Sequence, residues 1–203
     1  MVELILVRHA QSRPSDAIAH ADWPLSALGR AQAAALVAAL AEVEVDEIHS
    51  SPYRRCRDTI DPFATARGLP VRFHDGLRER LVVDRLVDDF HTIWQQSWAD
   101  FDFAMPRCES SRDAQARMCA AVLDICRTTA ARRVLISSHG NVLALLVNSV
   151  ERAFGIEHAS AIRNPDVLRM TYDGERLAWD DGFALPALDE LATHFTEQPL
   201  DRR

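Results

Sequence analysis

Lysine is absent from this sequence, so all 23 of its basic side chains are arginines. Phosphate-binding P-loops and Schiff-base chemistry both require a lysine amine, and the absence excludes both. Arginine can still bind anions, because its planar guanidinium group donates paired hydrogen bonds to phosphate or carboxylate oxygens. A formal net charge of −7 argues against general binding to nucleic acid or to an anionic membrane. An anionic ligand must therefore be bound by a local pocket.

Cysteine is scarce, and long apolar runs are missing. The four cysteines have no CxxC spacing, which predicts reduced thiols rather than a disulfide framework or a zinc site. The first apolar run, residues 4–7, is too short for a signal peptide or a membrane span, and no later segment is long enough. We therefore expect a cytoplasmic protein. The sequence contains no HExxH pair and no EF-hand loop, so we expect no protein-bound metal and no cofactor.

The length and the pattern of apolar residues predict the fold class. At 203 residues, 48% of them hydrophobic, the chain can bury one sizeable core, and we expect a single domain over residues 1–203. Short apolar runs alternate with helical segments, which indicates an α/β fold, a three-layer sandwich with a mainly parallel central sheet. Residues 82–110 interrupt this alternation with helical and irregular sequence. We expect this segment to form a helical cap over the active site.

The individual elements can be placed from their end signals. Strands are expected at residues 4–7 and 45–50, within PVRFHDGL from residue 70, and in the short apolar run before the two serines of RRVLISSHG, with a last strand at 167–172. Helices are expected at residues 26–43 with Ser26 as N-cap, from Pro52 to a stop at Gly68, within 82–98, at 111–129, and after Gly140. Glu109 and Ser110 are expected to cap the helix that follows them. The tail after Leu188 is expected to be dispensable.

Chemistry-bearing side chains follow three of the predicted strands. His9 and His139 each end an apolar strand and precede a small residue, so both should lie at the same edge of the sheet. Arg8 adjoins the first histidine. Three more arginines, at positions 54, 55 and 57, begin a helix that follows another strand. Guanidinium groups and a helix N-terminus that meet at one sheet edge are typical of a phosphate site.

An imidazole in such a site can act as a nucleophile. Neighbouring arginines lower its pKa and keep one ring nitrogen unprotonated, so that nitrogen can attack phosphorus. Glu79 is a candidate to protonate the departing oxygen. Taken singly, each of these residues also has an ordinary structural explanation, and only their combination favours catalysis. The six other histidines lack this context and are expected to be structural or surface residues: His20, His49, His74, His91, His158 and His194.

Five motifs, in order, resemble those of the histidine phosphatase superfamily, which includes cofactor-dependent phosphoglycerate mutases and many small phosphatases. The motifs are LVRHAQS, LSALGRAQA, IHSSPYRRCRDT, LRE and VLISSHGNV, and they cover most of the chain. The resemblance implies a phosphoglycerate mutase-like fold. It also implies that His9 becomes a phosphohistidine, with Glu79 as the acid and then the base.

The same resemblance implies a set of phosphate ligands. Arg8, Arg55 and His139 match the positions that hold the transferring phosphoryl group, and Arg55 fits the SSPxxR spacing better than Arg54. Ser15 stands where many members have an asparagine and is a further candidate phosphate ligand. The sequence elements that grip phosphoglycerate in the mutases, and the GxWEG motif of broad-specificity phosphatases, have no counterpart here.

Three functions are compatible with this sequence. We expect a metal-independent phosphomonoester phosphatase that acts through a phosphohistidine on a small phosphorylated metabolite or on a phosphoprotein. The first alternative is a cofactor-dependent phosphoglycerate mutase, which uses the same two histidines. The second is a catalytically inactive phosphate-binding or interaction module. No nucleic-acid or membrane partner is expected.

Overall fold

A single six-stranded sheet forms the centre of the computed structural model, which describes residues 1–190 and 192–194. Its strands lie in the order β3-β2-β4-β1-β5-β6. Their bounds are β1 Val2–Arg8, β2 Glu47–Ser50, β3 Val71–Phe73, β4 Arg133–Ser138, β5 Asp166–Tyr172 and β6 Leu177–Asp180. The neighbours among β1 to β4 pair in parallel, whereas β5 pairs antiparallel with both β1 and β6. The predicted α/β fold with a mainly parallel sheet is confirmed.

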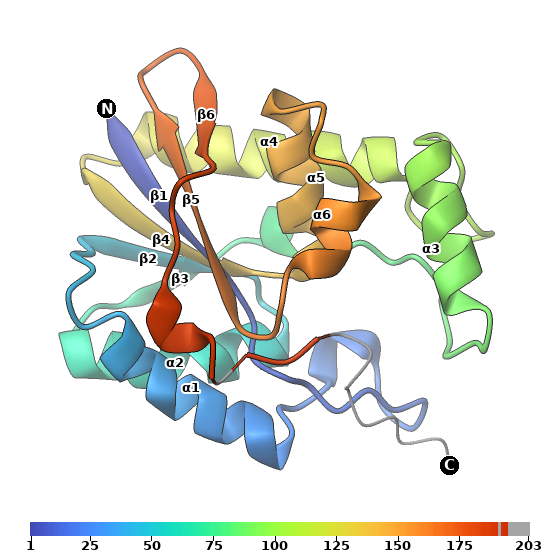
Figure 1. Ribbon diagram of the computed structural model, residues 1–203, viewed down its shortest axis with the longest axis horizontal. Helices are drawn as coiled ribbons and strands as arrows, with labels where there is room; N and C mark the ends of the chain where they lie inside the picture. The colour runs from blue at the N-terminus through green and yellow to red at the C-terminus, as the bar shows by residue number, and fades with distance from the viewer. Residues whose placement is uncertain (191, 195–203) are drawn as a thin grey trace.

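Helices cover both faces of this sheet (Figure 1). The α-helices are α1 Ala27–Ala39, α2 Arg54–Arg67, α3 Phe90–Ala99, α4 Ser111–Thr128, α5 Gly140–Val150 and α6 Ile156–Ala161. Helices α1 and α2 lie on one face, and α4, α5 and α6 lie on the other (Figure 1). Among the described residues, no helix has the length and apolar content needed to cross a membrane.

The central strand β1 is buried on both faces, which explains its continuous apolar sequence. Leu4 and Leu6 belong to the core that β1 shares with α4 and α5. The alternate residues Ile5 and Val7 belong to the core that it shares with α1 and α2. Since successive side chains in a strand point to opposite faces, one short strand anchors both layers.

The ends of the helices follow the predicted capping signals, with one difference. Ser26 Oγ accepts from Gly29 N at 2.9 Å, and Ser110 Oγ accepts from Asp113 N at 3.1 Å. Gly68 ends α2 with φ of 64°, a left-handed conformation that glycine adopts without strain. Helix α2, however, begins at Arg54, two residues after Pro52, so the prediction that Pro52 opens its first turn is wrong.

The C-terminal part of the sheet also differs from the prediction. The strand predicted at 167–172 is not the last one, because β6 follows it after a turn at Gly174, where φ is 109°. Strand β6 has four residues, none of them fully buried, so its sequence carries little apolar periodicity. Helix α6 was not predicted either. At six residues it is too short for a periodic pattern to stand out.

Residues 82–110 hold α3 between irregular segments, and α3 lies away from the sheet at one end of the molecule (Figure 1). A buried arginine ties this segment to the rest of the chain. Arg80 Nη1 donates to the hydroxyls of Ser97 and Ser111 at 2.9 and 2.6 Å. Its Nε donates to the carbonyl oxygen of Glu109 at 2.8 Å. One side chain therefore ties α3 to the C-terminal end of the segment.

Candidate active site

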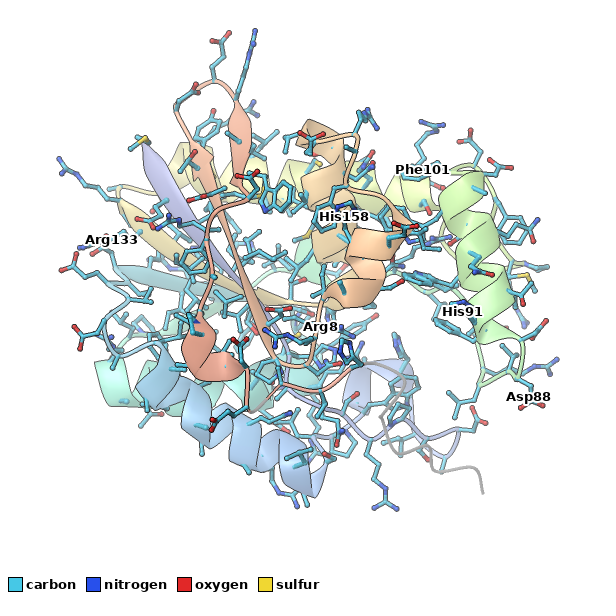
Figure 2. The ribbon with its side chains drawn as sticks, in the orientation of Figure 1. Arg8, Asp88, His91, Phe101, Arg133 and His158 are labelled. Carbon is cyan, nitrogen blue, oxygen red and sulfur yellow. The ribbon has the colours of Figure 1, made fainter. Side chains whose placement is uncertain are left out.

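The two predicted histidines lie next to each other at the carboxyl ends of β1 and β4. Register pairs Arg8 with Ser138, and His9 N donates to Ser138 O at 3.0 Å. The chain therefore leaves both strands at the same level, and the His9 and His139 ring centroids are 5.2 Å apart. Figure 2 shows Arg8 in the middle of the molecule, where these strands end.

The tautomer of His9 is fixed by its two neighbours. Nδ1 lies 2.7 Å from the carbonyl oxygen of Ala10, which can only accept, so Nδ1 carries the proton. Nε2 is then unprotonated, and it accepts a hydrogen bond from Arg55 Nε at 3.2 Å. Burial, and next the charges of Arg55 and Arg8, lower the pKa of His9 well below its usual value. The ring therefore presents an unprotonated nitrogen at neutral pH.

Arg55 is the cation in direct contact with that nitrogen. It is 2% exposed and lies in the first turn of α2. Tyr53 and Trp23 both lie near the guanidinium group, with ring centroids 5.1 and 5.6 Å from Cζ. Arg54 instead pairs with Asp58 on the exposed side of the same helix. The structure thus separates the two arginines as the SSPxxR spacing predicts.

Arg8 is the second buried cation of the site. Its Nη1 donates to the carbonyl oxygen of Ile162, and its Nε has no hydrogen-bond partner among the described residues. Burial lowers the pKa of Arg8 to about 10, so the side chain stays charged at neutral pH. A Cβ atom on Gly140 would lie 2.7 Å from Arg8 Cζ. A side chain at this position would therefore force the Arg8 guanidinium group to move.

His139 is held by Ser51, which directly follows β2, and by Cys56 of α2. Its Nε2 lies 2.8 Å from Ser51 Oγ, and the buried Cys56 sulfur lies 3.4 Å from the same nitrogen. Burial, and next the charge of Arg55, lower the pKa of His139 well below its usual value. Neither Ser51 nor Cys56 was predicted as a site residue. The serine lies inside the SSP motif, but the contact with His139 is visible only in three dimensions.

Glu79 lies at the N-terminus of α5, the helix that follows His139 in the chain. Its carboxylate oxygens accept from the backbone amides of Asn141 and Val142 at 3.3 and 3.2 Å, and from Arg80 N at 2.9 Å. Free amides at a helix N-terminus attract a carboxylate, and they hold this one in a fixed orientation. With Tyr53 and other residues, Glu79 lines an open pocket of about 360 Å³.

Ser15 and His20 differ in whether they contact the candidate site. Ser15 is buried, and its Oγ accepts from Ala17 N at 3.1 Å, so it stabilises its own turn. Its role as a phosphate ligand stays a prediction. His20, expected to be a structural or surface residue, lies against Arg55, whose Nη1 donates to the His20 carbonyl oxygen at 2.8 Å. This contact with an arginine of the candidate site was not predicted.

Asn164, from the C-terminal part of the chain, binds the backbone of His9. Asn164 Nδ2 donates to His9 O at 2.8 Å, and the backbone of Asn164 pairs with that of Thr193 through bonds of 2.7 and 2.9 Å. Thr193 belongs to the tail that was expected to be dispensable, and its pairing with Asn164 connects this tail to the backbone of the site. The final motif of the tail, residues 197–203, lies outside the described residues.

The described residues contain no group of three or more histidine, cysteine, aspartate or glutamate side chains arranged to hold a metal ion. The fold and the site instead define an α/β protein with two neutral imidazoles and two buried guanidinium groups at one sheet edge. This arrangement is suited to a phosphoryl group. The chain belongs to the histidine phosphatase superfamily (branch 1), whose sequence model matches residues 4–181.

Individual relatives of the chain include mutases and phosphatases. It is 29% identical to a probable phosphoglycerate mutase GpmB of Shigella dysenteriae, with 94% of this chain and 99% of the relative covered. A mycobacterial glucosyl-3-phosphoglycerate phosphatase, solved with VO3, superposes with a TM-score of 0.74 at 25% identity, covering 89% of this chain and 98% of its own. A phosphoserine phosphatase mutant from Entamoeba histolytica, in complex with phosphoserine, has a TM-score of 0.72 at 17% identity, with coverage of 93% and 100%. The second structural likeness supports the fold alone.

Proposed function

We propose that this protein is a metal-independent phosphomonoester phosphatase that works through a phosphohistidine at His9. One observation carries the proposal: His9 Nδ1 is committed to the Ala10 carbonyl oxygen, which leaves Nε2 unprotonated beside Arg55. A nucleophilic imidazole needs this tautomer and a cation close to the reacting oxygens.

In the first half-reaction, His9 Nε2 attacks phosphorus while the bond from phosphorus to the alcohol oxygen breaks. Arg8, Arg55 and His139 hold the nonbridging oxygens and offset the charge that they carry in the transition state. A proton moves from Glu79 to the departing oxygen. Glu79 is suited to this role because it lines the open pocket, which leaves room for the alcohol portion of the substrate.

In the second half-reaction, water replaces the alcohol. Glu79, now a carboxylate, accepts a proton from water as the water oxygen bonds to phosphorus and the bond to His9 Nε2 breaks. His9 returns to the neutral tautomer, and inorganic phosphate and a protonated Glu79 remain. The two arginines supply the positive charge that a metal ion provides in other phosphoryl-transfer sites, and this supports a mechanism without a metal.

Residues 82–110 are proposed to act as a cap over this site within a single domain. Trp94 Nε1 of α3 donates to Asn141 Oδ1 at 3.4 Å, so α3 contacts the first turn of α5, where Glu79 is bound. The pocket beside Glu79 is lined partly by Arg107, Cys108 and Glu109 from this segment. We propose that the segment contacts the leaving group and selects the substrate.

The decisive experiment measures hydrolysis of p-nitrophenyl phosphate in EDTA by the wild type and His9→Ala. Turnover should survive EDTA and disappear in the variant, and acid-labile labelling by a radioactive phosphomonoester should disappear with it. His158→Ala is the matched control, because His158 lies on the exposed side of α6 (Figure 2). Full activity in His9→Ala, or full loss in EDTA, would contradict the proposal.

A phosphoglycerate mutase is the second candidate, and the relatives named as probable phosphoglycerate mutases favour it. A mutase must retain its phosphohistidine long enough to return the phosphoryl group to the substrate. A requirement for bisphosphoglycerate priming, with little release of phosphate, would identify that activity. Binding of phosphate without any turnover would instead identify an inactive binding module.

The substrate is proposed to be a small phosphorylated metabolite or a phosphoprotein. The structural relative at 25% identity is named for glucosyl-3-phosphoglycerate, a phosphomonoester that carries a carboxylate. A screen of phosphorylated hydroxy acids, sugar phosphates and phosphopeptides, scored by phosphate release, tests this proposal once activity is established.

A further inference from the structure

The chain that leads into Glu79 is bound by Arg117, a residue of helix α4. Arg117 Nη1 donates to the carbonyl oxygens of Gly76 and Arg78 at 2.7 and 3.0 Å. The Arg78 carbonyl belongs to the peptide bond that joins Arg78 to Glu79. One guanidinium group therefore fixes the peptide bond immediately before the candidate acid.

The Arg117 guanidinium group is in turn oriented by Glu109, at the C-terminal end of the cap. Arg117 Nε and Nη2 donate to the two carboxylate oxygens of Glu109 at 2.8 and 2.6 Å. The two side chains are only 14% and 17% exposed, so water screens this ion pair less than a pair on the surface. A bidentate pair of this kind holds the planar guanidinium group in one orientation, with Nη1 toward the carbonyl oxygens.

The backbone of Glu109 binds the chain that follows Glu79. Glu109 N donates to Leu81 O at 3.0 Å, and Arg80 Nε donates to Glu109 O at 2.8 Å. The backbone is therefore held before Glu79 by Arg117 and after it by Glu109.

The carboxylate of Glu79 tolerates little displacement of this backbone. Its hydrogen bonds from the amides of Asn141 and Val142 measure 3.3 and 3.2 Å, at the long end of the usual range. A small shift of the backbone would break them. Transfer of a proton requires the acid to lie within hydrogen-bond distance of the departing oxygen, and a misplacement of about 1 Å can cost about 100-fold in rate.

We propose that Arg117 and Glu109 are positioning residues for the acid of the reaction. Their ion pair holds the backbone of residues 78–81, so that Glu79 stays on the amides of α5 and can transfer its proton to the departing oxygen. Because Glu109 belongs to the cap, the same pair connects the cap to the acid. This inference rests on the proposed function, since it concerns the step that Glu79 performs there.

Three substitutions and one control test this role. Arg117→Met removes the guanidinium group, Glu109→Gln removes the charge of its partner, and Glu79→Gln removes the acid. Arg112→Met is the matched control, because Arg112 also lies on α4 and pairs with a carboxylate of the cap, that of Asp102, but on the exposed surface. We measure kcat and KM with p-nitrophenyl phosphate, phenyl phosphate and glycerol phosphate. Calorimetry gives the dissociation constant of inorganic phosphate, and circular dichroism melting checks each fold.

The expected loss depends on the leaving group. Arg117→Met should lower kcat/KM by about 30- to 100-fold with glycerol phosphate but by about threefold or less with p-nitrophenyl phosphate, whose leaving group hardly needs a proton. Phosphate binding should not change, because the side chains that hold the phosphoryl group are intact. Glu109→Gln should show the same dependence with a smaller loss, and Arg112→Met should match the wild type.

A double variant shows whether Arg117 acts through Glu79. On glycerol phosphate, Glu79→Gln/Arg117→Met should be no slower than Glu79→Gln, since the acid that Arg117 positions is already gone. A further loss as large as that of Arg117→Met alone would overturn the proposal. An equal loss with all three substrates would overturn it too, because Arg117 would then support the fold rather than the acid. Where Arg117→Met melts too low for assay, Glu109→Gln provides the same test.

Failure of this inference can be told apart from failure of the proposed function. A wild type without any hydrolysis would refute both. His9-dependent hydrolysis with losses that ignore the leaving group would refute the role of Arg117 alone. If Glu79→Gln hydrolyses glycerol phosphate as fast as the wild type, Glu79 is not the acid, and the inference fails while the phosphohistidine mechanism stands.

Discussion

Replacing Arg55 with lysine keeps a positive charge at the site but removes the shape of the guanidinium group. Arg55 donates to His9 Nε2, to the His20 carbonyl oxygen and to His20 Nε2, over distances of 2.8 to 3.3 Å. A lysine amine is a single point on a flexible stem, so it can replace one of these contacts at most. The flat contacts with Tyr53 and Trp23 are weakened as well.

The size of the effect follows from the number of donors lost. Removing one preorganised donor from a site of this kind lowers kcat by about 10²- to 10³-fold, or about 3 to 4 kcal/mol. We therefore expect Arg55→Lys to lower kcat/KM for p-nitrophenyl phosphate by at least about 10²-fold. Arg54→Lys is the matched control, because Arg54 lies one position away and pairs with Asp58 on the surface. Its activity should stay within about twofold of the wild type, since surface ion pairs contribute little.

An Arg55→Lys variant with more than a fifth of wild-type kcat/KM would refute this reasoning. Charge alone would then be sufficient at this position, and the fork of hydrogen bonds would have no catalytic importance. Equal losses in the Arg54 and Arg55 variants would point to damage at the start of α2 rather than to loss of a phosphoryl contact. Melting temperatures of both variants separate these outcomes.

Three further predictions concern packing and pH. Gly140→Ala should lower kcat/KM at least about tenfold, because the added Cβ would displace the Arg8 guanidinium group. Gly155→Ala is its control and should leave kcat/KM unchanged, since a Cβ there would meet its nearest atom only at 3.9 Å. Arg80→Met should destabilise the fold by about 2 to 4 kcal/mol in urea denaturation, since buried partners lose their donor, and Arg112→Met on the surface should not. Burial lowers the pKa of the site imidazoles, so the unfolded chain binds more protons, and stability should fall as pH drops below about 6.5. Urea midpoints that stay constant from pH 7.5 to 5 would contradict this last prediction.

The part of the site that lies at strand ends could be predicted from sequence. His9 and His139 follow apolar runs, and parallel strands bring their carboxyl ends to one edge. The neighbouring position of β1 and β4 then places the two rings 5.2 Å apart. Arg55 could be predicted for a related reason, since the first turn of a helix that follows a strand lies at the same edge.

His20 could not be predicted in this way, because it lies in the irregular segment between β1 and α1. No periodic pattern fixes the path of such a loop, and its position depends on the contacts between its own residues and α2. Asn164 and Thr193 illustrate the same limit. Their pairing joins residues 29 positions apart and reaches His9 through a single side chain, and neither residue belongs to a motif.

The buried cation at position 8 is an arginine, and a lysine in its place would hold its charge less firmly. Burial lowers the pKa of Arg8 from its usual 12.5 to about 10, which leaves the guanidinium group charged throughout the neutral range. The same burial would lower the pKa of a lysine amine, whose ordinary pKa of about 10.4 already lies closer to neutrality. We therefore expect Arg8→Lys to lower kcat/KM at all pH values, with a further loss as pH rises into the alkaline range. The measurement is a pH profile of kcat/KM for wild type and variant in the same buffers, and parallel profiles would show that a buried cation at this position need not be an arginine.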